Sequence, residues 1–160
     1  FGDRLGQALK RAQRTSSSVA LMFVDLDKFK PINDTYGHEA GDFMLQTVAK
    51  RLSGCLRASD TAARVGGDEF LVLLPDIPSG ADALAVAEKI RSALAEPCTS
   101  PDGIELCISA SIGIAIYPEH AGTEHELLRL GDRAMYEAKS AGGNRVKLFG
   151  PEDGAGHSAA

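Results

Sequence analysis

Two short stretches place carboxylates where an ordinary core would not. Asp25-Leu26-Asp27 ends the most apolar run of the chain, and Gly66-Gly67-Asp68-Glu69 separates two short β-prone runs. Either stretch alone is typical of a strand end or a turn that meets water. Together they favour a divalent cation, because Mg²⁺ binds carboxylate and phosphate oxygens and reverses the repulsion between facing carboxylates. Paired glycines also permit positive φ and a close approach of a ligand to the backbone, which suits a metal-bound triphosphate.

Apolar periodicity predicts the elements that must position these groups. The run over 18–25 predicts a central strand covered on both faces, and runs over 61–65 and 70–74 predict a hairpin around the glycines. Helical spacing is found at about 5–12, 27–34, 39–56, 81–95 and 124–140, and β segments at 103–117 and 146–149. This order predicts an α+β fold that is palm-like (ferredoxin-like or nucleotidyl-cyclase-like), with a central, mostly antiparallel sheet flanked by helices.

Length and composition narrow the class of protein. We expect one domain over residues 1–149 of the 160, followed by a flexible tail or linker over 150–160. A net charge of −5 argues against nucleic acid as a partner, and no apolar run is long enough to cross a membrane. The three cysteines are expected to be reduced, buried thiols. With neither a start methionine nor a signal peptide, the chain is expected to be a cytoplasmic fragment, or the cytoplasmic part of a membrane-anchored protein.

The segment from Arg64 to Phe70, RVGGDEF, resembles the signature of the GGDEF family. The resemblance extends from about residue 5 to residue 149, through ordered blocks at 23–27, 29–30, 32–34, 37–38, 41–42, 111–115 and 134–139. It implies a diguanylate cyclase, which condenses two GTP into cyclic di-GMP and two pyrophosphates using Mg²⁺ or Mn²⁺. It also implies sensor or regulatory domains fused to this one.

The resemblance implies roles for individual residues. Asp25, the Leu26 backbone carbonyl and Asp68 would bind metal, and Glu69 is a second candidate ligand. Asp68 is linked to activation of the GTP 3′-hydroxyl, and whether it or Glu69 acts as the catalytic base stays open. The residues implied in substrate binding are Lys30, Asn33, His38, Asp42, Gly66, Gly67 and Lys139.

Simple chemistry agrees with part of this assignment. A carboxylate such as Asp42 accepts from the N1–H and N2–H₂ donors of guanine, and the amide of Asn33 can pair with O6 or N3. His38 would shape the same pocket or bind ribose. Lys30 and Lys139 would contact phosphate as point charges. In the position where the family often has an arginine, this chain has Gly143, with Arg145 two places further on.

Arg57-Ala58-Ser59-Asp60 has the spacing of the family's R-x-x-D inhibitory site, which binds product cyclic di-GMP away from the active centre. Arginine can clamp phosphate and guanine, and aspartate accepts from guanine. Lys89 falls near a family position that is usually arginine and is a weaker second contact. The alternative interpretation of Arg57 and Asp60 is an ordinary surface pair.

The two-fold symmetry of cyclic di-GMP implies a transient antiparallel homodimer, since one domain holds one GTP. One alternative is a degenerate domain that senses GTP or cyclic di-GMP; Gly143 favours it, while intact Asp25, Asp68 and Glu69 argue against it. A partner-binding module and a cyclase that makes a mixed purine dinucleotide are two others. Asp42 argues against the mixed product.

Overall fold

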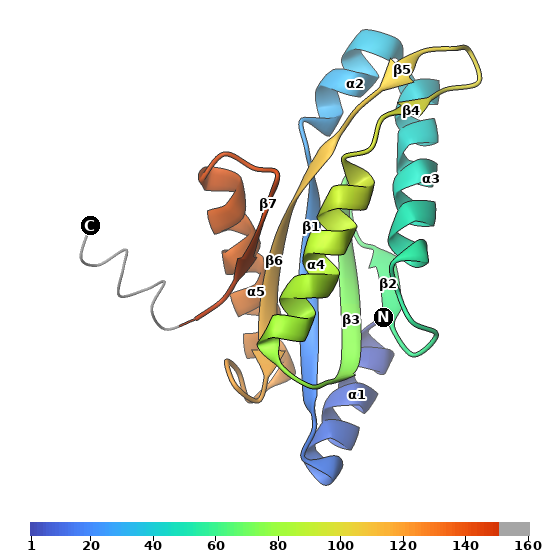
Figure 1. Cartoon of the computed structure of the whole chain (residues 1–160). Coiled ribbons are helices and arrows are strands. Elements are labelled where there is room, and N and C mark those ends of the chain that lie inside the picture. Colours follow the sequence, from blue (N-terminus) through green and yellow to red (C-terminus); the bar gives the residue numbers. More distant parts are fainter. Residues whose placement is uncertain (151–160) are drawn as a thin grey trace.

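The computed structural model describes residues 1–150, which form a five-stranded sheet covered by helices on both faces (Figure 1). The predicted tail lies outside the described residues except for Gly150. In chain order the elements are α1 (Gly2–Thr15), β1 (Ser18–Asp27), α2 (Phe29–Tyr36), α3 (His38–Gly54), β2 (Thr61–Arg64), β3 (Glu69–Ile77), α4 (Gly80–Leu94), β4 (Cys98–Thr99), β5 (Glu105–Leu106), β6 (Ser109–Tyr117), α5 (Glu124–Ser140) and β7 (Arg145–Leu148).

The sheet has the order β2-β3-β1-β6-β7, which confirms the predicted α+β fold with a central, apolar first strand. The β2–β3, β3–β1 and β1–β6 pairs are antiparallel, and only β6–β7 is parallel. The predicted β segment over 103–117 is two separate strands, and β5 pairs with β4 in a small second sheet. Strands of two residues are too short to produce a periodic pattern, so β4 could not be predicted from the sequence.

The alternation of side chains along β1 divides the core into two layers. Ala20, Met22 and Val24 pack with residues of α2, α3 and α4 on one face. Leu21 and Phe23 pack with residues of α1 and α5 on the other. In Figure 1, α4 crosses in front of the sheet and α5 lies behind β6. The same alternation places Asp25 and Asp27, at the end of β1, on the α5 face.

Helix α5 approaches the sheet closely because two glycines lie at the contact. A Cβ atom on Gly113 of β6 would overlap the backbone of Gly131 and Met135 in α5, and one on Gly131 would lie 2.8 Å from the Phe23 ring. Thr123 caps the N-terminus of this helix, since its side chain accepts a hydrogen bond from the Glu126 N–H. This packing fixes the last turn of α5, which carries Lys139, beside the end of β1.

Two further expectations can be compared with the structure. The three cysteines are free, but the expectation of burial is wrong: Cys55 and Cys98 are half-buried and Cys107 is exposed. Among the described residues, no helix combines the length and the apolar character that crossing a bilayer would require.

We predict that Gly113→Ala destabilises the protein by about 3 kcal/mol, the upper range for overpacking, because the new methyl group meets α5 backbone that cannot rotate away. Thermal unfolding would measure the loss. Gly54→Ala is the matched control: no atom lies within 4 Å of its added Cβ, and alanine favours the helix. Equal melting temperatures for the two variants would contradict this account of α5 packing.

Candidate active site

The end of β1 brings the two acidic stretches together. Asp25 pairs in register with Glu69 on β3 and with Ser111 on β6. Side chains opposite each other in an antiparallel pair share one face, so Asp25 and Glu69 are neighbours. The Leu26 N–H donates to the Asp68 carbonyl at 3.0 Å, which ties the hairpin to the strand end. The four residues predicted to bind metal therefore converge.

The ammonium group of Lys139 lies among the oxygens of this strand end. Its Nζ atom is 3.1 Å from Asp25 Oδ1, 3.3 Å from the Leu26 carbonyl oxygen and 3.4 Å from Asp27 Oδ1. Asp25 and the Leu26 carbonyl are two of the predicted metal ligands. These oxygens therefore already bind one positively charged group, the Lys139 ammonium.

Asp25 and Glu69 hold their protons more tightly than ordinary carboxyl groups do, because both are buried and other carboxylates lie nearby. Burial raises the pKa of Asp25, and although Lys139 lowers it, the charges of Asp68 and Asp27 raise it further. Burial also raises the pKa of Glu69, assisted by repulsion from Asp25, Asp132 and Asp68. A site that is short of positive charge fits a divalent cation.

The oxygen atoms available also fit the preference of Mg²⁺. Asp25 Oδ1 is buried and, apart from the ion pair with Lys139, accepts no hydrogen bond from the described residues. No group of three His, Cys, Asp or Glu side chains in residues 1–150 could hold a metal alone. Mg²⁺ commonly uses one or two carboxylates together with substrate phosphates, so Asp25, the Leu26 carbonyl and Asp68, with Glu69 nearby, are sufficient protein ligands.

Asp27 has very different surroundings from Asp25, and the sequence alone indicates no separate role for it. Its carboxylate accepts from the Ser109 and Ser111 hydroxyls, each at 2.7 Å, and from the Asn144 N–H at 2.8 Å. Burial raises the pKa of Asp27, but these hydrogen bonds and Lys139 together outweigh it and hold the pKa below its ordinary value. The alternate serines at 109 and 111 were the only sequence signal for this arrangement.

The hairpin that carries Asp68 is held by Arg64. Its guanidinium donates to the Gly66 carbonyl at 3.0 Å and, through Nη2, to the Gly67 carbonyl at 2.9 Å. Neither glycine adopts positive φ, so the turn does not use the conformational freedom that paired glycines permit. No atom lies within 4 Å of a Cβ placed on Gly67, so the backbone there is open to a ligand.

The residues implied in guanine binding lie on α2 and α3. A Cβ on Gly41 would overlap the Asn33 side chain, so that amide lies directly on the backbone next to Asp42. Asp42 also lines a hollow of about 350 Å³, together with Tyr36, Phe43 and the segment 100–102. Lys30 and His38 are exposed on the same pair of helices.

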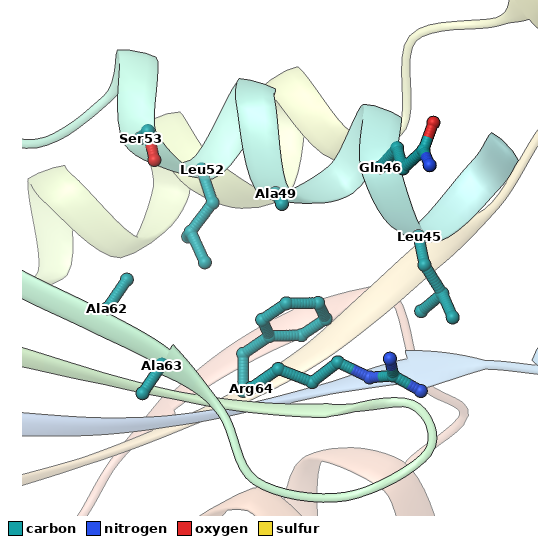
Figure 2. A pocket seen from close by; sticks show the side chains of 9 residues that line it. Leu45, Gln46, Ala49, Leu52, Ser53, Ala62, Ala63 and Arg64 are labelled. Carbon is teal, nitrogen blue, oxygen red and sulfur yellow. The ribbon is translucent and has the colours of Figure 1, made fainter. Parts of the chain in front are cut away.

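A second hollow, of about 290 Å³, lies between α3 and β2 and contains none of the predicted catalytic carboxylates. Figure 2 shows Leu45 and Leu52 pointing from α3 toward β2, with Arg64 at the hairpin end. Phe70 also lines it and belongs to the core layer of α2, α3 and α4. This hollow is thus on the face of the sheet opposite to Asp25.

Arg57 and Asp60 form a closed pair after α3. Arg57 Nη2 donates to Asp60 Oδ1 at 2.8 Å and to the Pro75 carbonyl at 2.8 Å, and the Asp60 side chain is only 2% exposed. Asp60 raises the pKa of Arg57. Lys89 on α4 lies near Cys55, whose thiol pKa it lowers against the larger effect of burial. The hydrogen bond and ion pair between Arg57 and Asp60 keep the two R-x-x-D side chains together.

We predict that Asp25→Asn raises the melting temperature of the metal-free protein at pH 7, because the folded site disfavours the Asp25 charge. A raised folded pKa means that stability falls as pH rises through it. The gain should therefore shrink as pH falls and disappear below the ordinary carboxyl pKa of 3.8, where Asp25 is protonated in both the folded and the unfolded state. Thermal unfolding in chelator across this pH range would test it. Asp27→Asn, the control two residues away, should destabilise at pH 7; a lower melting temperature for Asp25→Asn would contradict the account.

Comparison with known proteins agrees with this geometry. The family described as "Diguanylate cyclase, GGDEF domain" matches residues 1–145. The diguanylate cyclase TpbB of Pseudomonas aeruginosa is 49% identical over 139 residues, which cover 87% of this chain and 32% of that protein. This chain thus spans about a third of the length of that curated relative.

Two solved structures have the same fold. The crystal structure of the GGDEF domain of TpbB (YfiN) matches with a TM-score of 0.90 and 46% identity, covering 92% of each chain. The GGDEF domain of DgcB from Caulobacter crescentus, in complex with c-di-GMP, matches with a TM-score of 0.84 and 30% identity, covering 92% of this chain and 87% of that one. With its signature hairpin paired to the acidic end of β1, this chain belongs to the GGDEF domain family of diguanylate cyclases.

Proposed function

We propose that this domain is a metal-dependent diguanylate cyclase that converts two GTP into cyclic di-GMP and two pyrophosphates. The observation that carries the proposal is Asp25, whose buried Oδ1 has no partner among the described residues apart from the ion pair with Lys139, and which lies in register with the start of β3 beside the GGDEF turn. Buried carboxylates with a purely structural role normally accept several hydrogen bonds, as Asp27 does. A buried carboxylate oxygen that lacks them and lies among other acids, as Asp25 Oδ1 does, fits a ligand of a cation. Because GTP is an intracellular nucleotide, we expect the site to face the cytoplasm.

In each half-reaction the 3′-oxygen of one GTP forms a bond to the α-phosphorus of the other. The bond from that phosphorus to pyrophosphate breaks, and the hydroxyl proton passes to a base. Bound Mg²⁺ or Mn²⁺ would lower the pKa of the hydroxyl and offset phosphate charge. Asp68 and Glu69 are the candidate bases, since both carboxylates lie on the hairpin beside the proposed metal ligands. Lys139, with Lys30, would stabilise the departing pyrophosphate.

Base selection would come from Asn33 and Asp42, with His38 beside them. The contact of Asn33 with the Gly41 backbone supports this role, since it holds the amide next to the carboxylate that would accept from guanine. A site that pairs the edge of guanine rejects adenine, because each unmatched buried polar group costs about 1–3 kcal/mol.

One domain would bind one GTP, so the symmetric product requires two domains facing each other in antiparallel orientation. Most of the rate would then come from holding the 3′-oxygen in line with the partner's α-phosphorus. We also propose that Arg57 and Asp60, with Lys89, bind product as an inhibitor. The hydrogen bond between Arg57 and Asp60 supports this proposal because it holds the two side chains together, and product would have to share or replace that bond.

A receptor without turnover is the second candidate, and Gly143 favours it. Gly143 has φ +73°, and a Cβ there would lie 3.0 Å from the Asp27 carboxylate, so the turn as built leaves no room for the arginine often found at this position. The phosphate contact that such an arginine would make is then missing from this domain. The intact acids at Asp25, Asp68 and Glu69 outweigh this single loss.

We predict that protein incubated with GTP and Mg²⁺ makes cyclic di-GMP, with specific activity that rises as enzyme concentration rises. Nucleotide chromatography would measure the product. Asp25→Asn should lower the rate at least a hundredfold or so, the scale of lost transition-state electrostatics, while Asp3→Asn, a matched change at an exposed site, should not. A tethered dimer that binds GTP without releasing pyrophosphate would establish the receptor instead.

We predict that Gly41→Ala raises the KM for GTP about tenfold, the effect of one displaced hydrogen-bonding group, with little change in melting temperature. The new Cβ pushes the Asn33 amide aside, and a side-chain end moves easily. Preference for GTP over ATP should fall in parallel. Gly54→Ala, at the other end of the same helix, should retain wild-type kinetics. An unchanged KM would remove Asn33 from guanine recognition.

A further inference from the structure

The carboxylate of Asp27 is satisfied on every side. Its Oδ1 atom accepts from Ser111 at 2.7 Å and lies 3.4 Å from Lys139 Nζ, and Oδ2 accepts from Ser109 at 2.7 Å and from the Asn144 N–H at 2.8 Å. An ionised carboxylate has about four lone-pair directions. All of them are occupied, so a metal ion could bind Asp27 only by displacing a partner.

These partners come from separate parts of the fold. The serines belong to β6, Lys139 to the last turn of α5, and Asn144 to the turn that leads into β7. Gly143 closes this turn directly over the carboxylate, since even a methyl group there would lie 3.0 Å from it. Asp27 therefore joins β1, β6 and the end of α5 at one point.

Lys139 is shared between this anchored carboxylate and the candidate metal ligands. Its three oxygen contacts are Asp25 Oδ1, the Leu26 carbonyl and Asp27 Oδ1. A divalent ion bound to the first two would repel the ammonium from them. The contact with Asp27 would remain, because hydrogen bonds from Ser109, Ser111 and Asn144 already hold that carboxylate in place.

We propose that Asp27 is a positioning residue and not a metal ligand: it retains the Lys139 ammonium beside Asp25 when a cation and phosphates occupy the site. The proposal rests on the proposed function. It gives the two aspartates of one strand end different tasks, one to bind the ion and the other to hold the lysine that faces the phosphates.

Metal binding without nucleotide provides the first test. Mn²⁺ titrated into the protein and followed by electron paramagnetic resonance should bind Asp27→Asn within about twofold of wild type, whereas Asp25→Asn should bind at least tenfold or so more weakly. Asp3→Asn is the charge-matched control. A tenfold loss in Asp27→Asn would make it a ligand and overturn the proposal. Unchanged binding in Asp25→Asn would instead overturn the proposed metal site, so the two failures differ.

Steady-state kinetics provide the second test. Asp27→Asn should raise the KM for GTP about tenfold, as loss of a supporting hydrogen bond does, and Lys139→Met should raise it to a similar degree. The double variant should be no worse than either, because both changes remove one positioned ammonium. If the two effects multiply, Asp27 acts separately from Lys139 and the proposal fails.

Lys139→Met alone tests the arrangement if Asp27→Asn does not fold. Asp27 keeps its serine and Asn144 hydrogen bonds in this variant, so we expect a melting temperature close to wild type. Nucleotide-free Mn²⁺ affinity should rise, because the ammonium no longer occupies Asp25 and the Leu26 carbonyl. An affinity that falls would show that Lys139 does not share the oxygens of the metal, which would contradict the proposal.

Discussion

Repulsion among carboxylates at the end of β1 is the constraint around which this domain is arranged. Asp25, Asp27, Asp68 and Glu69 gather where the central strand of the sheet leaves the core, and their charges act on one another. At an effective dielectric constant of 20, two such charges about 4 Å apart repel by about 4 kcal/mol. Lys139 offsets part of this repulsion. The remainder makes the site attractive to a divalent ion.

The fold supports this arrangement through backbone packing more than through surface ion pairs. Gly113 and Gly131 let α5 lie against the sheet, which puts Lys139 within reach of a strand 113 residues earlier in the chain. The Leu26 N–H bond to Asp68 holds the hairpin against the same strand end. Two aspartates with the same orientation then differ in their partners, because Ser109 and Ser111 both donate to Asp27, whereas the described partner of Asp25 Oδ1 is Lys139.

Sequence patterns predicted the long elements well, since α3, α5, β1 and β3 bury continuous stripes or runs whose period identifies them. Convergence of Asp25 with the hairpin was also predictable, given the resemblance to a family with this signature. The surroundings of Asp27 could not be predicted, because they depend on the register that sets Ser109 and Ser111 beside it. Burial of the cysteines was predicted wrongly, because tertiary packing decides it: Cys107 is exposed.

The most direct test of the account is to locate the metal. Crystals grown with Mn²⁺ and a non-hydrolysable GTP analogue would show the ion by anomalous scattering. We predict a peak within about 2.0–2.6 Å of Asp25, the Leu26 carbonyl and the analogue's phosphates, the range for hard cations and oxygen, with Asp68 adjacent and Asp27 still bonded to its serines. A peak on Asp27, or phosphates bound with no ion at Asp25, would contradict it.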